Sequence, residues 1–272
     1  MISRKANRSK GVYLPASGKR TRQSSIYKPN QTEDFKVSRS KFSDSLNCKR
    51  CFYNDRVLGL AAPGMPGWTL NNLTDTLLKK EFDHCREKQI PHRLFETNGL
   101  SHVVPFDHPD IDAWRDARHR GLKLRYKNTN IVLTGGIDDI WLDTASNQLI
   151  IVDYKSQAKA GTVHTEEYLN DIFHLGYKTQ MNFYAYLLIG MGFDVHPISY
   201  FLVVNGDSTQ QAFNSVMRFD EYLIPYELDT SKIEGQVDEM ISLMNQNVIP
   251  EAEPSCENCA YSEQYIRALY PH

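Results

Sequence analysis

Two acidic side chains that could bind a metal ion lie within apolar segments of the sequence. A lysine stands close to one of them. Asp138 stands in the segment 131–142, and Asp153 and Lys155 end the segment 148–155. Both segments are rich in β-branched and aromatic residues, which predicts two strands joined by a short polar hairpin loop. In this hairpin Asp138 faces Asp153, and the Cβ atoms of such a pair are about 5 Å apart, a spacing at which two carboxylates can share a divalent cation.

Lys155 points to the same face as Asp153, because side chains two residues apart in a strand lie on one side. Facing carboxylates repel each other and are poorly solvated between apolar strands, and a metal ion would supply the missing positive charge. The alternative is that Asp138 lies in water at the end of a strand, while Asp153 and Lys155 form a local ion pair. For an isolated Asp-x-Lys pattern that alternative would be the better one.

A longer pattern favours the metal site. Gly136-Ile137-Asp138 is followed by Asp153-Tyr154-Lys155 and then by Gln180 and Tyr184, which are one turn apart on a predicted helix and share a face. This order resembles the RecB-like branch of the PD-(D/E)XK nuclease superfamily, in which G-x-(I/V)-D, D-x-K and Q-x-x-x-Y succeed one another. Taken alone, Gln180 and Tyr184 would be an ordinary polar and aromatic pair on an amphipathic helix.

The resemblance implies a fold and a catalytic site. The fold would be a restriction-endonuclease-like α/β core, with a small mixed sheet flanked by helices. Asp138, Asp153 and the backbone carbonyl of Tyr154 would hold Mg²⁺ or Mn²⁺, and Lys155 would orient the attacking water. The glutamine and tyrosine of the third motif would contact the substrate or brace the lysine.

A further acidic ligand is implied on a helix before the sheet. Apolar residues at helical spacing predict a helix over residues 70–88. Asp75 occupies the place of the superfamily's first acidic motif best, and Glu81 is the reserve candidate. Acids on exposed helix faces are common, so an ordinary solvated Asp75 is the alternative.

Four of the five cysteines form two Cys-x-x-Cys pairs, Cys48 with Cys51 and Cys256 with Cys259. In a reducing compartment, four thiolates at this spacing suit tetrahedral zinc or an iron–sulfur cluster. Each pair offers only two thiolates, and no histidine stands beside either pair at a zinc-knuckle spacing. We therefore expect one shared centre that joins these two parts of the chain. Cys85, within the helix predicted above, is expected to be a small buried side chain.

The resemblance extends to these cysteines. RecB-like nucleases with an iron–sulfur cluster bracket the nuclease core with one N-terminal and three C-terminal cysteines, and the run Cys48-Lys49-Arg50-Cys51-Phe52-Tyr53 is similar to their N-terminal element. In this chain the division is two and two, and Tyr265 stands where a further C-terminal cysteine would be. The resemblance, which covers roughly residues 42–262, implies a 4Fe–4S cluster, with Zn²⁺ as the alternative.

Further elements follow from hydrophobic periodicity and turn signals. We expect a helix from Ser43 that carries the first cysteine pair, a long helix at 165–191, strands near 196–204 and 215–223, and a last helix near 230–246. Residues 1–40 have few apolar side chains in any period and are expected to be a flexible basic tail, which leaves 41–272 as the nuclease domain.

The basic residues are unevenly distributed along the chain. The net charge is −2, but residues 1–32 contain eight Lys or Arg and no acid, so the remaining residues sum to −10. A body that binds nucleic acid must therefore gather its basic residues locally. The densest basic stretch could contact a nucleic-acid backbone or be a solvated face, and it contains Arg115, Arg118, Arg120, Lys123, Arg125 and Lys127.

Composition excludes several classes of protein. With 272 residues, 41% of them hydrophobic and 24% charged, the chain can bury a sizeable core, which excludes a wholly disordered chain, a coiled coil and a disulfide scaffold. No apolar stretch approaches the ~20 residues that span a bilayer, and the first residues lack the apolar core of a secretory signal. We therefore expect a cytoplasmic protein without a membrane partner.

The expected function is that of a Mg²⁺- or Mn²⁺-dependent nuclease that hydrolyses phosphodiester bonds of DNA, single-stranded DNA included, in repair, recombination or defence. By analogy with RecB-like nucleases it would have a helicase or repair partner. Two alternatives stay open. One is a catalytically silent DNA-binding or assembly protein that retains the nuclease fold, and the other is a zinc-stabilised protein whose carboxylates serve only structure.

Overall fold

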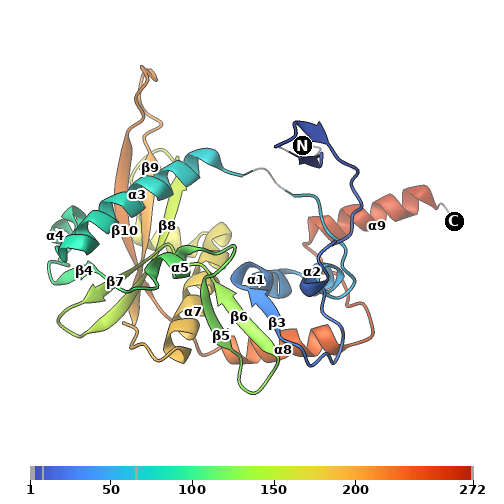
Figure 1. Cartoon of the computed structure of the whole chain (residues 1–272). Helices are drawn as coiled ribbons and strands as arrows, with labels where there is room; N and C mark the ends of the chain where they lie inside the picture. Colours follow the sequence, from blue (N-terminus) through green and yellow to red (C-terminus); the bar gives the residue numbers. More distant parts are fainter. Residues whose placement is uncertain (1–3, 8, 65–66, 271–272) are drawn as a thin grey trace. The chain divides into compact units, whose positions relative to one another are not determined.

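The structure is a computed structural model that describes residues 4–7, 9–64 and 67–270 (Figure 1). These residues form two compact units. The terminal unit comprises residues 1–67, 125–132 and 234–272, and the central unit comprises residues 68–124 and 133–233. No helix within the described ranges is long and apolar enough to cross a membrane.

A five-stranded mixed sheet runs through the central unit in the order β10-β9-β8-β7-β4. Its strands are β4 (Val103–Pro105), β7 (Asp139–Asp143), β8 (Gln148–Gln157), β9 (Ile198–Gly206) and β10 (Phe219–Glu227). β8 and β9 are parallel, and the other neighbouring strands are antiparallel. A parallel pair requires a crossover, which the helices between β8 and β9 provide. Every side chain from Leu149 to Tyr154 is buried, as expected for a central strand with both faces covered.

Helices cover both faces of this sheet. They are α3 (Thr69–Lys88), α4 (Arg93–Thr97), α5 (Ile111–Arg115), α6 (Thr165–Asn170) and α7 (Leu175–Gly190), with a 3-10 turn η2 (Ile172–His174). Phe82 of α3 packs against Trp141 and Tyr154 on one face. Gln180 of α7 donates a hydrogen bond to Asp153 on the other face, because neighbouring residues of a strand point to opposite sides. The expected α/β fold, with a small mixed sheet flanked by helices, is therefore confirmed, as is the helix predicted over residues 70–88.

The hairpin between β7 and β8 has the predicted register. Asp143 pairs with Gln148, and the ladder continues to the pair of Asp139 and Val152. The Asp143 carboxylate closes the loop by accepting hydrogen bonds from the backbone N–H groups of Ala145 (2.8 Å) and Ser146 (3.1 Å). Asp138 lies one residue before this ladder, so its predicted position opposite Asp153 falls just outside the paired residues.

The prediction of one strand over residues 131–142 is wrong, because the chain forms two strands there. β6 (Ile131–Gly135) ends before Gly136, and β7 begins at Asp139. Between them the backbone N–H of Ile137 donates to the carbonyl of Trp114 (3.2 Å) and not to a neighbouring strand. A side chain at Gly136 would clash with the backbone of Ala117, so this close approach needs glycine. The break places Asp138 at the start of the hairpin, beside the end of β8.

The prediction of one long helix over residues 165–191 is also wrong. The segment divides into α6, η2 and α7, and the division falls at Asp171, whose backbone is extended. The Asp171 carboxylate accepts a hydrogen bond from the backbone N–H of Phe173 (2.9 Å) and so starts a new turn. Asparagine and aspartate favour such local hydrogen bonds over a continued helix, which explains the break at Asn170-Asp171.

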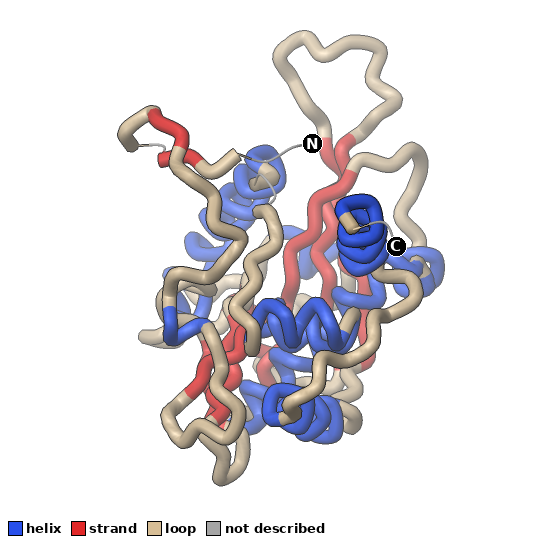
Figure 2. The backbone as a smooth tube through the Cα atoms, turned by 90° about the vertical axis from the view of Figure 1, so that its right-hand side faces the viewer, coloured by secondary structure: helices blue, strands red, loops and turns tan. Residues whose placement is uncertain are grey.

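β9 and β10 form a long hairpin whose loop, residues 207–218, projects beyond the sheet (Figures 1 and 2). The two strands are paired from Ile198 with Glu227 to Gly206 with Phe219. Both were predicted from the sequence, at 196–204 and 215–223, and the structure moves their bounds by a few residues. Such shifts are ordinary because strand ends are weakly encoded in local sequence.

The terminal unit is built mainly from helices at the two ends of the chain. Its elements are β1 (Ala6–Asn7), β2 (Val12–Tyr13), η1 (Gln23–Ser25), β3 (Phe35–Ser38), α1 (Arg39–Asn47), α2 (Lys49–Arg56), α8 (Ile233–Asn245) and α9 (Glu257–Leu269). A second sheet has the order β3-β6-β5, and the division between the units falls within β5 (Leu122–Arg125) and β6.

Packing in the terminal unit begins before the boundary at residue 41 that we predicted. Tyr27, Phe35 and Val37 are buried. The Tyr27 hydroxyl donates to the side chain of Asn245 (3.0 Å), so an early segment contacts the end of α8. The flexibility of the remainder of residues 1–40 stays a prediction.

Candidate functional site

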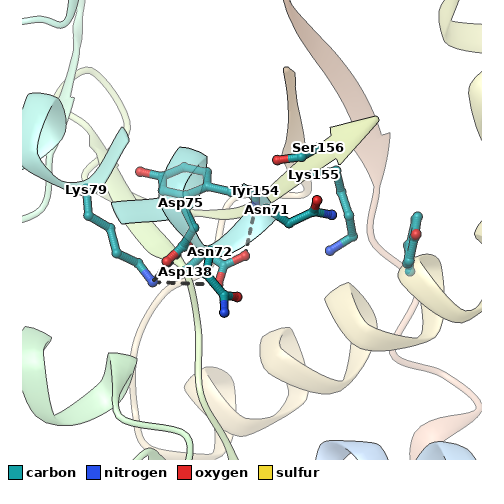
Figure 3. Close-up of a pocket in the computed structure, with 9 residues that line it drawn as sticks. Asn71, Asn72, Asp75, Lys79, Asp138, Tyr154, Lys155 and Ser156 are labelled. Atoms are coloured by element: carbon teal, nitrogen blue, oxygen red, sulfur yellow. Dashed lines mark hydrogen bonds and ion pairs between the residues drawn. The ribbon is translucent and has the colours of Figure 1, made fainter. Parts of the chain in front are cut away.

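A pocket of about 330 Å³ lies in the central unit, where α3, the start of the hairpin and the end of β8 converge (Figure 3). Four residues that were predicted from the sequence to serve catalysis or metal binding line it together, namely Asp75, Asp138, Tyr154 and Lys155. The other lining residues are Asn71, Asn72, Lys79, Ser156 and Tyr177.

Asp138 is held in a position where its negative charge is disfavoured. Its carboxylate accepts a hydrogen bond from the backbone N–H of Tyr154 (2.8 Å), and 26% of its side chain is exposed. Burial and the charge of Asp153 raise the pKa of Asp138 to about 6, although Lys155 and Lys79 lower it. A bound cation would remove this penalty, because it favours the charged form of a carboxylate.

Asp75 of α3 lines the same pocket. Lys79, one turn further along the same helix, lies 2.9 Å from the Asp75 carboxylate and 4.0 Å from that of Asp138. Burial raises the pKa of Asp75, and the nearby charge of Asp138 adds to this effect. Figure 3 shows Lys79 reaching toward both acids. Two carboxylates from different elements therefore meet at one place.

Glu81, the reserve candidate, lies elsewhere. Its carboxylate contacts His92 (3.1 Å) and Arg93 (3.2 Å) at the far end of α3. The geometry therefore favours Asp75 over Glu81 as the acid that α3 contributes.

Asp153 has no exposed surface and lies beside the pocket on β8. Its two carboxylate oxygens have different partners. One forms an ion pair with Lys155, and the other accepts a hydrogen bond from the side-chain amide of Gln180 (2.5 Å). The Lys155 ammonium also lies 4.5 Å from the ring centroid of Tyr177, a cation–π distance. Asp153 thus joins the Asp-x-Lys motif to the Gln-x-x-x-Tyr motif.

Gln180 and Tyr184 share one face of α7, as their spacing predicted. The Gln180 amide lies 3.3 Å from the Tyr184 hydroxyl, which donates to the carbonyl of Gly136 (2.6 Å). The Tyr184 ring also packs on Gly135, where a side chain would clash with it. These contacts link Asp153 to the segment that carries Asp138, so the two residues are placed to position the acids.

A buried ion network holds the residue that follows Asp138. Asp139, the residue after Asp138, is fully buried and accepts from the Tyr154 hydroxyl (2.8 Å). It forms ion pairs with Arg86 and with Arg115 (2.7 Å). Asp139 and Arg86 were not predicted from the sequence, although a second acid within an apolar strand is a signal for a buried cationic partner.

The six basic residues of the stretch at 115–127 do not form one surface. Arg115 is in the buried network, with 8% of its side chain exposed. The central unit also carries Arg120, which pairs with Asp116 (3.3 Å). Arg125 pairs with Asp34 (2.6 Å), and Lys127 pairs with Glu234 (3.2 Å), all within the terminal unit. Over the described residues, the side chains of Arg118 and Lys123 are exposed and have no ion pair.

Five further residues of the pocket were not predicted from the sequence, namely Lys79, Asn71, Asn72, Ser156 and Tyr177. Lys79 could have been found, because it stands four residues after Asp75 and such pairs share a helix face. Ser156 points to the side opposite Lys155, and its hydroxyl lies 2.5 Å from that of Thr74 on α3. This contact depends on tertiary packing, which local sequence does not encode.

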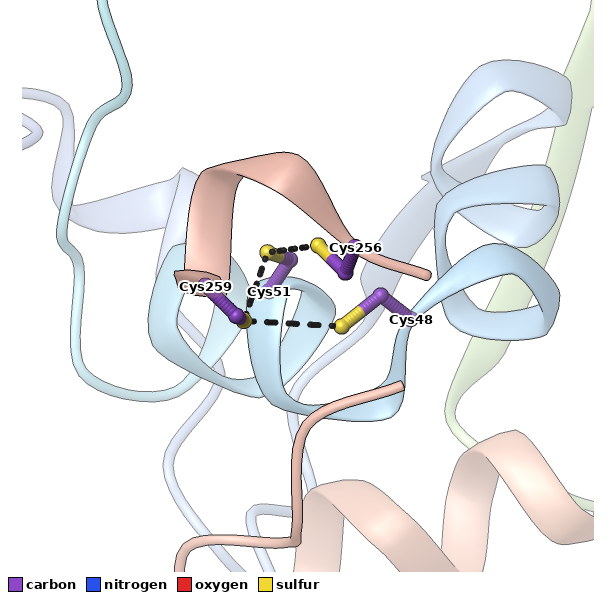
Figure 4. Close-up of side chains that lie close together, drawn as sticks. All are labelled: Cys48, Cys51, Cys256 and Cys259. Carbon is purple, nitrogen blue, oxygen red and sulfur yellow. Dashed lines mark hydrogen bonds between the residues drawn. The ribbon is translucent and has the colours of Figure 1, made fainter. Parts of the chain in front are cut away.

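Cys48, Cys51, Cys256 and Cys259 lie together in the terminal unit (Figure 4). All four are free thiols, and their sulfur atoms lie within 4.8 Å of one another. Cys48 precedes the first residue of α2, and Cys256 precedes the first residue of α9. The prediction that the two pairs come together is confirmed, and this donor set can bind a metal ion. Cys85 is buried apart from them in α3, as expected.

The pKa of Cys48 differs from that of its neighbours. Burial raises the pKa of this thiol, but hydrogen bonds from the backbone of Cys51 and Glu253 and from the other thiols outweigh it and lower the pKa to about 7. Burial raises the pKa of Cys259 to about 11, and it also raises that of Cys51. Four thiols this close cannot all ionise without a cation, which is the condition that a metal site meets.

Comparison with known proteins identifies the family of this chain. No match was found among curated proteins. A family model of the PD-(D/E)XK nuclease superfamily matches residues 68–264, a range that begins just before α3 and includes every residue of the pocket. The chain belongs to the PD-(D/E)XK nuclease superfamily.

Proposed function

We propose that the protein is a Mg²⁺- or Mn²⁺-dependent deoxyribonuclease of the RecB-like branch. The observation that carries this proposal is the meeting of Asp75 and Asp138 in one pocket, next to Asp153 and Lys155, in a chain of this superfamily. The expected biological setting is DNA repair, recombination or defence, where a helicase partner would supply single strands.

Oxygen donors of the kind that a hard divalent cation needs lie in the pocket and beside it. Asp75, Asp138, Asp153 and the backbone carbonyl of Tyr154 would hold the ion, and Mg²⁺ and Mn²⁺ prefer such oxygen ligands. When bound, the ion polarises the phosphate and lowers the pKa of a water ligand. The raised pKa values of Asp75 and Asp138 support this assignment, because burial disfavours the negative charge of both acids and a bound cation would stabilise it.

Lys155 would act on the attacking water and on the charge that develops at phosphorus. Its ammonium group lies at the pocket wall, fixed between Asp153 and the ring of Tyr177. A fixed cation in a partly buried site stabilises a transition-state charge without further reorganisation. Gln180 and Tyr184 would serve as positioning residues, because they bind Asp153 and Gly136.

Single-stranded DNA is the substrate that the surroundings of the pocket favour. Trp68, at the start of α3, is 69% exposed and stands three residues before Asn71 of the pocket. Phe173 is 84% exposed and stands four residues before Tyr177. Exposed aromatic rings can stack on the bases of a single strand, whereas the bases of a duplex are already stacked and paired. Arg118 and Lys123 would contribute phosphate contacts.

The test is cleavage of labelled single-stranded and double-stranded oligonucleotides with Mg²⁺, with Mn²⁺ and with EDTA. We expect metal-dependent cleavage, faster on the single strand and lost in Asp138→Asn. Binding of DNA without cleavage under any metal condition would favour the catalytically silent alternative. A Trp68→Ala and Phe173→Ala double variant should lose the single-strand preference while keeping the metal response.

A further inference from the structure

We propose that the four-cysteine centre binds one Zn²⁺ ion and not a 4Fe–4S cluster. The inference concerns Cys48, Cys51, Cys256 and Cys259 of the terminal unit. It does not depend on the nuclease proposal, because none of these residues belongs to the pocket.

The distances between the sulfur atoms carry this inference. Sγ of Cys51 lies 3.5 Å from Sγ of Cys256 and 3.5 Å from that of Cys259, and Sγ of Cys48 lies 3.7 Å from that of Cys259. Zn–S bonds of about 2.3 Å in a tetrahedron place the sulfur atoms about 3.8 Å apart. In a 4Fe–4S cluster each thiolate binds a different iron, so the sulfur atoms are roughly 6 Å apart. The other pairs of sulfur atoms lie within 4.8 Å of one another, so the whole set is closer to the spacing around a single ion than to that of a cluster.

Contacts outside the cysteines also join the two segments that carry them. Arg50, between the first two cysteines, donates to the carbonyl of Pro250 (2.9 Å) and pairs with Glu263 of α9. The Tyr53 hydroxyl donates to the carbonyl of Gln246 (2.9 Å). These bonds hold α2 against the C-terminal segment independently of the thiols.

The two halves of the centre are built in the same way. In each pair the first cysteine is the N-cap of a helix and the second is its third residue. Four thiolates around Zn²⁺ carry a net charge of −2, and the partial positive charges at two helix N-termini lie beside them. Each pair thus supplies two ligands and one helix start, a division of two and two that differs from the one and three of the cluster-binding relatives.

A zinc ion in this centre would be structural. Zn²⁺ has no redox chemistry in proteins, and four cysteine ligands leave no open position for substrate or water. Cys48 and Cys259 are buried, with 6% and 5% of their surface exposed, so the ion would be shielded. The ion would clamp α2 to α9 and would not transfer electrons.

Metal analysis of the whole chain tests this inference. The protein is purified anaerobically from cells supplied with both iron and zinc, and iron, zinc and acid-labile sulfide are measured per chain. We expect one zinc, with neither iron nor sulfide, and a colourless protein. About four irons and four sulfides per chain would overturn the proposal, and so would a chain that holds no tightly bound metal.

Two variants and a spectroscopic probe give independent readings. Cys256→His should keep one zinc, because three cysteines and one histidine form a zinc site. Cys85→Ser is the matched control and should also keep one zinc. Co²⁺ added to the zinc-free protein should give the visible absorption of a tetrahedral thiolate site. An octahedral cobalt spectrum would contradict the four-ligand assignment, whatever the outcome of the nuclease assays.

Discussion

At the scale of single residues, the pocket holds acids whose negative charge is unfavourable. Asp138 is the clearest case, because burial and Asp153 raise its pKa to about 6 from an ordinary value of 3.8. The folded protein therefore binds this proton more tightly than the unfolded chain does. The resulting cost to folding is fully present above pH 6 and is relieved as the pH falls toward 4.

Asp138→Asn should stabilise the metal-free protein at pH 8. The asparagine can still accept the hydrogen bond from Tyr154 but carries no charge, and we expect a gain on the order of 1–3 kcal/mol. The gain should shrink at pH 5, where Asp138 is protonated in the wild type. Urea unfolding in EDTA at both pH values measures it, and a variant less stable than the wild type at pH 8 would contradict the assigned environment.

Asp75 and Glu81 provide a matched pair on one helix. Asp75→Asn should reduce cleavage by at least about 100-fold, because it removes a metal ligand. The loss of a residue that only orients a ligand already lowers activity by about 10–100-fold. Glu81→Gln should cleave within a few fold of the wild type, since Glu81 contacts His92 and Arg93 away from the pocket. Initial rates at saturating Mg²⁺ decide the matter. The reverse order would move the ligand role to Glu81.

At the scale of elements, the hairpin and the ion network behind it determine where the acids lie. The break between β6 and β7 puts Asp138 at the pocket, while Asp139 turns to the other side and pairs with Arg86 and Arg115. Arg115 thus belongs to the support of the hairpin. It is therefore expected to affect nucleic-acid binding only indirectly, through the position of the hairpin.

Arg115→Ala should therefore destabilise the central unit by about 3 kcal/mol, because it leaves Asp139 buried with one partner fewer. Arg118→Ala, its exposed neighbour, should leave stability unchanged and weaken DNA binding with a shallower salt dependence. Chemical unfolding and binding titrations at several salt concentrations separate the two effects. An Arg115→Ala protein of wild-type stability would argue against the network.

At the scale of the whole molecule, the sequence predicted features that depend on local patterns. The hairpin register, the helix over residues 70–88 and the meeting of the four cysteines were of this kind, since each follows from periodicity, turn residues or ligand number. The break at Gly136 was not predictable, because it depends on the distant contact with Ala117 and Trp114. The burial of Arg115 was missed for the same reason, since its partner Asp139 is distant in sequence.

Removal of zinc should loosen the terminal unit first. The centre joins segments about two hundred residues apart, and structural zinc contributes folding free energy directly. Hydrogen exchange after chelation should show faster exchange in α2 and α9, with smaller changes in β7, β8 and α7. Equal protection of α2 and α9 with and without chelator would mean that the four thiols do not hold a structural ion.

The central claim is that the pocket around Asp138 and Lys155 hydrolyses DNA with a divalent cation. Lys155→Ala tests it most directly, because this side chain lies at the pocket wall and needs no other assignment to be correct. Lys232→Ala, an exposed lysine of the same unit, is the matched control. We predict Mg²⁺-dependent cleavage of a labelled single strand by the wild type and by Lys232→Ala, and a loss of at least about 100-fold in folded Lys155→Ala. Wild-type cleavage by purified Lys155→Ala would contradict the account.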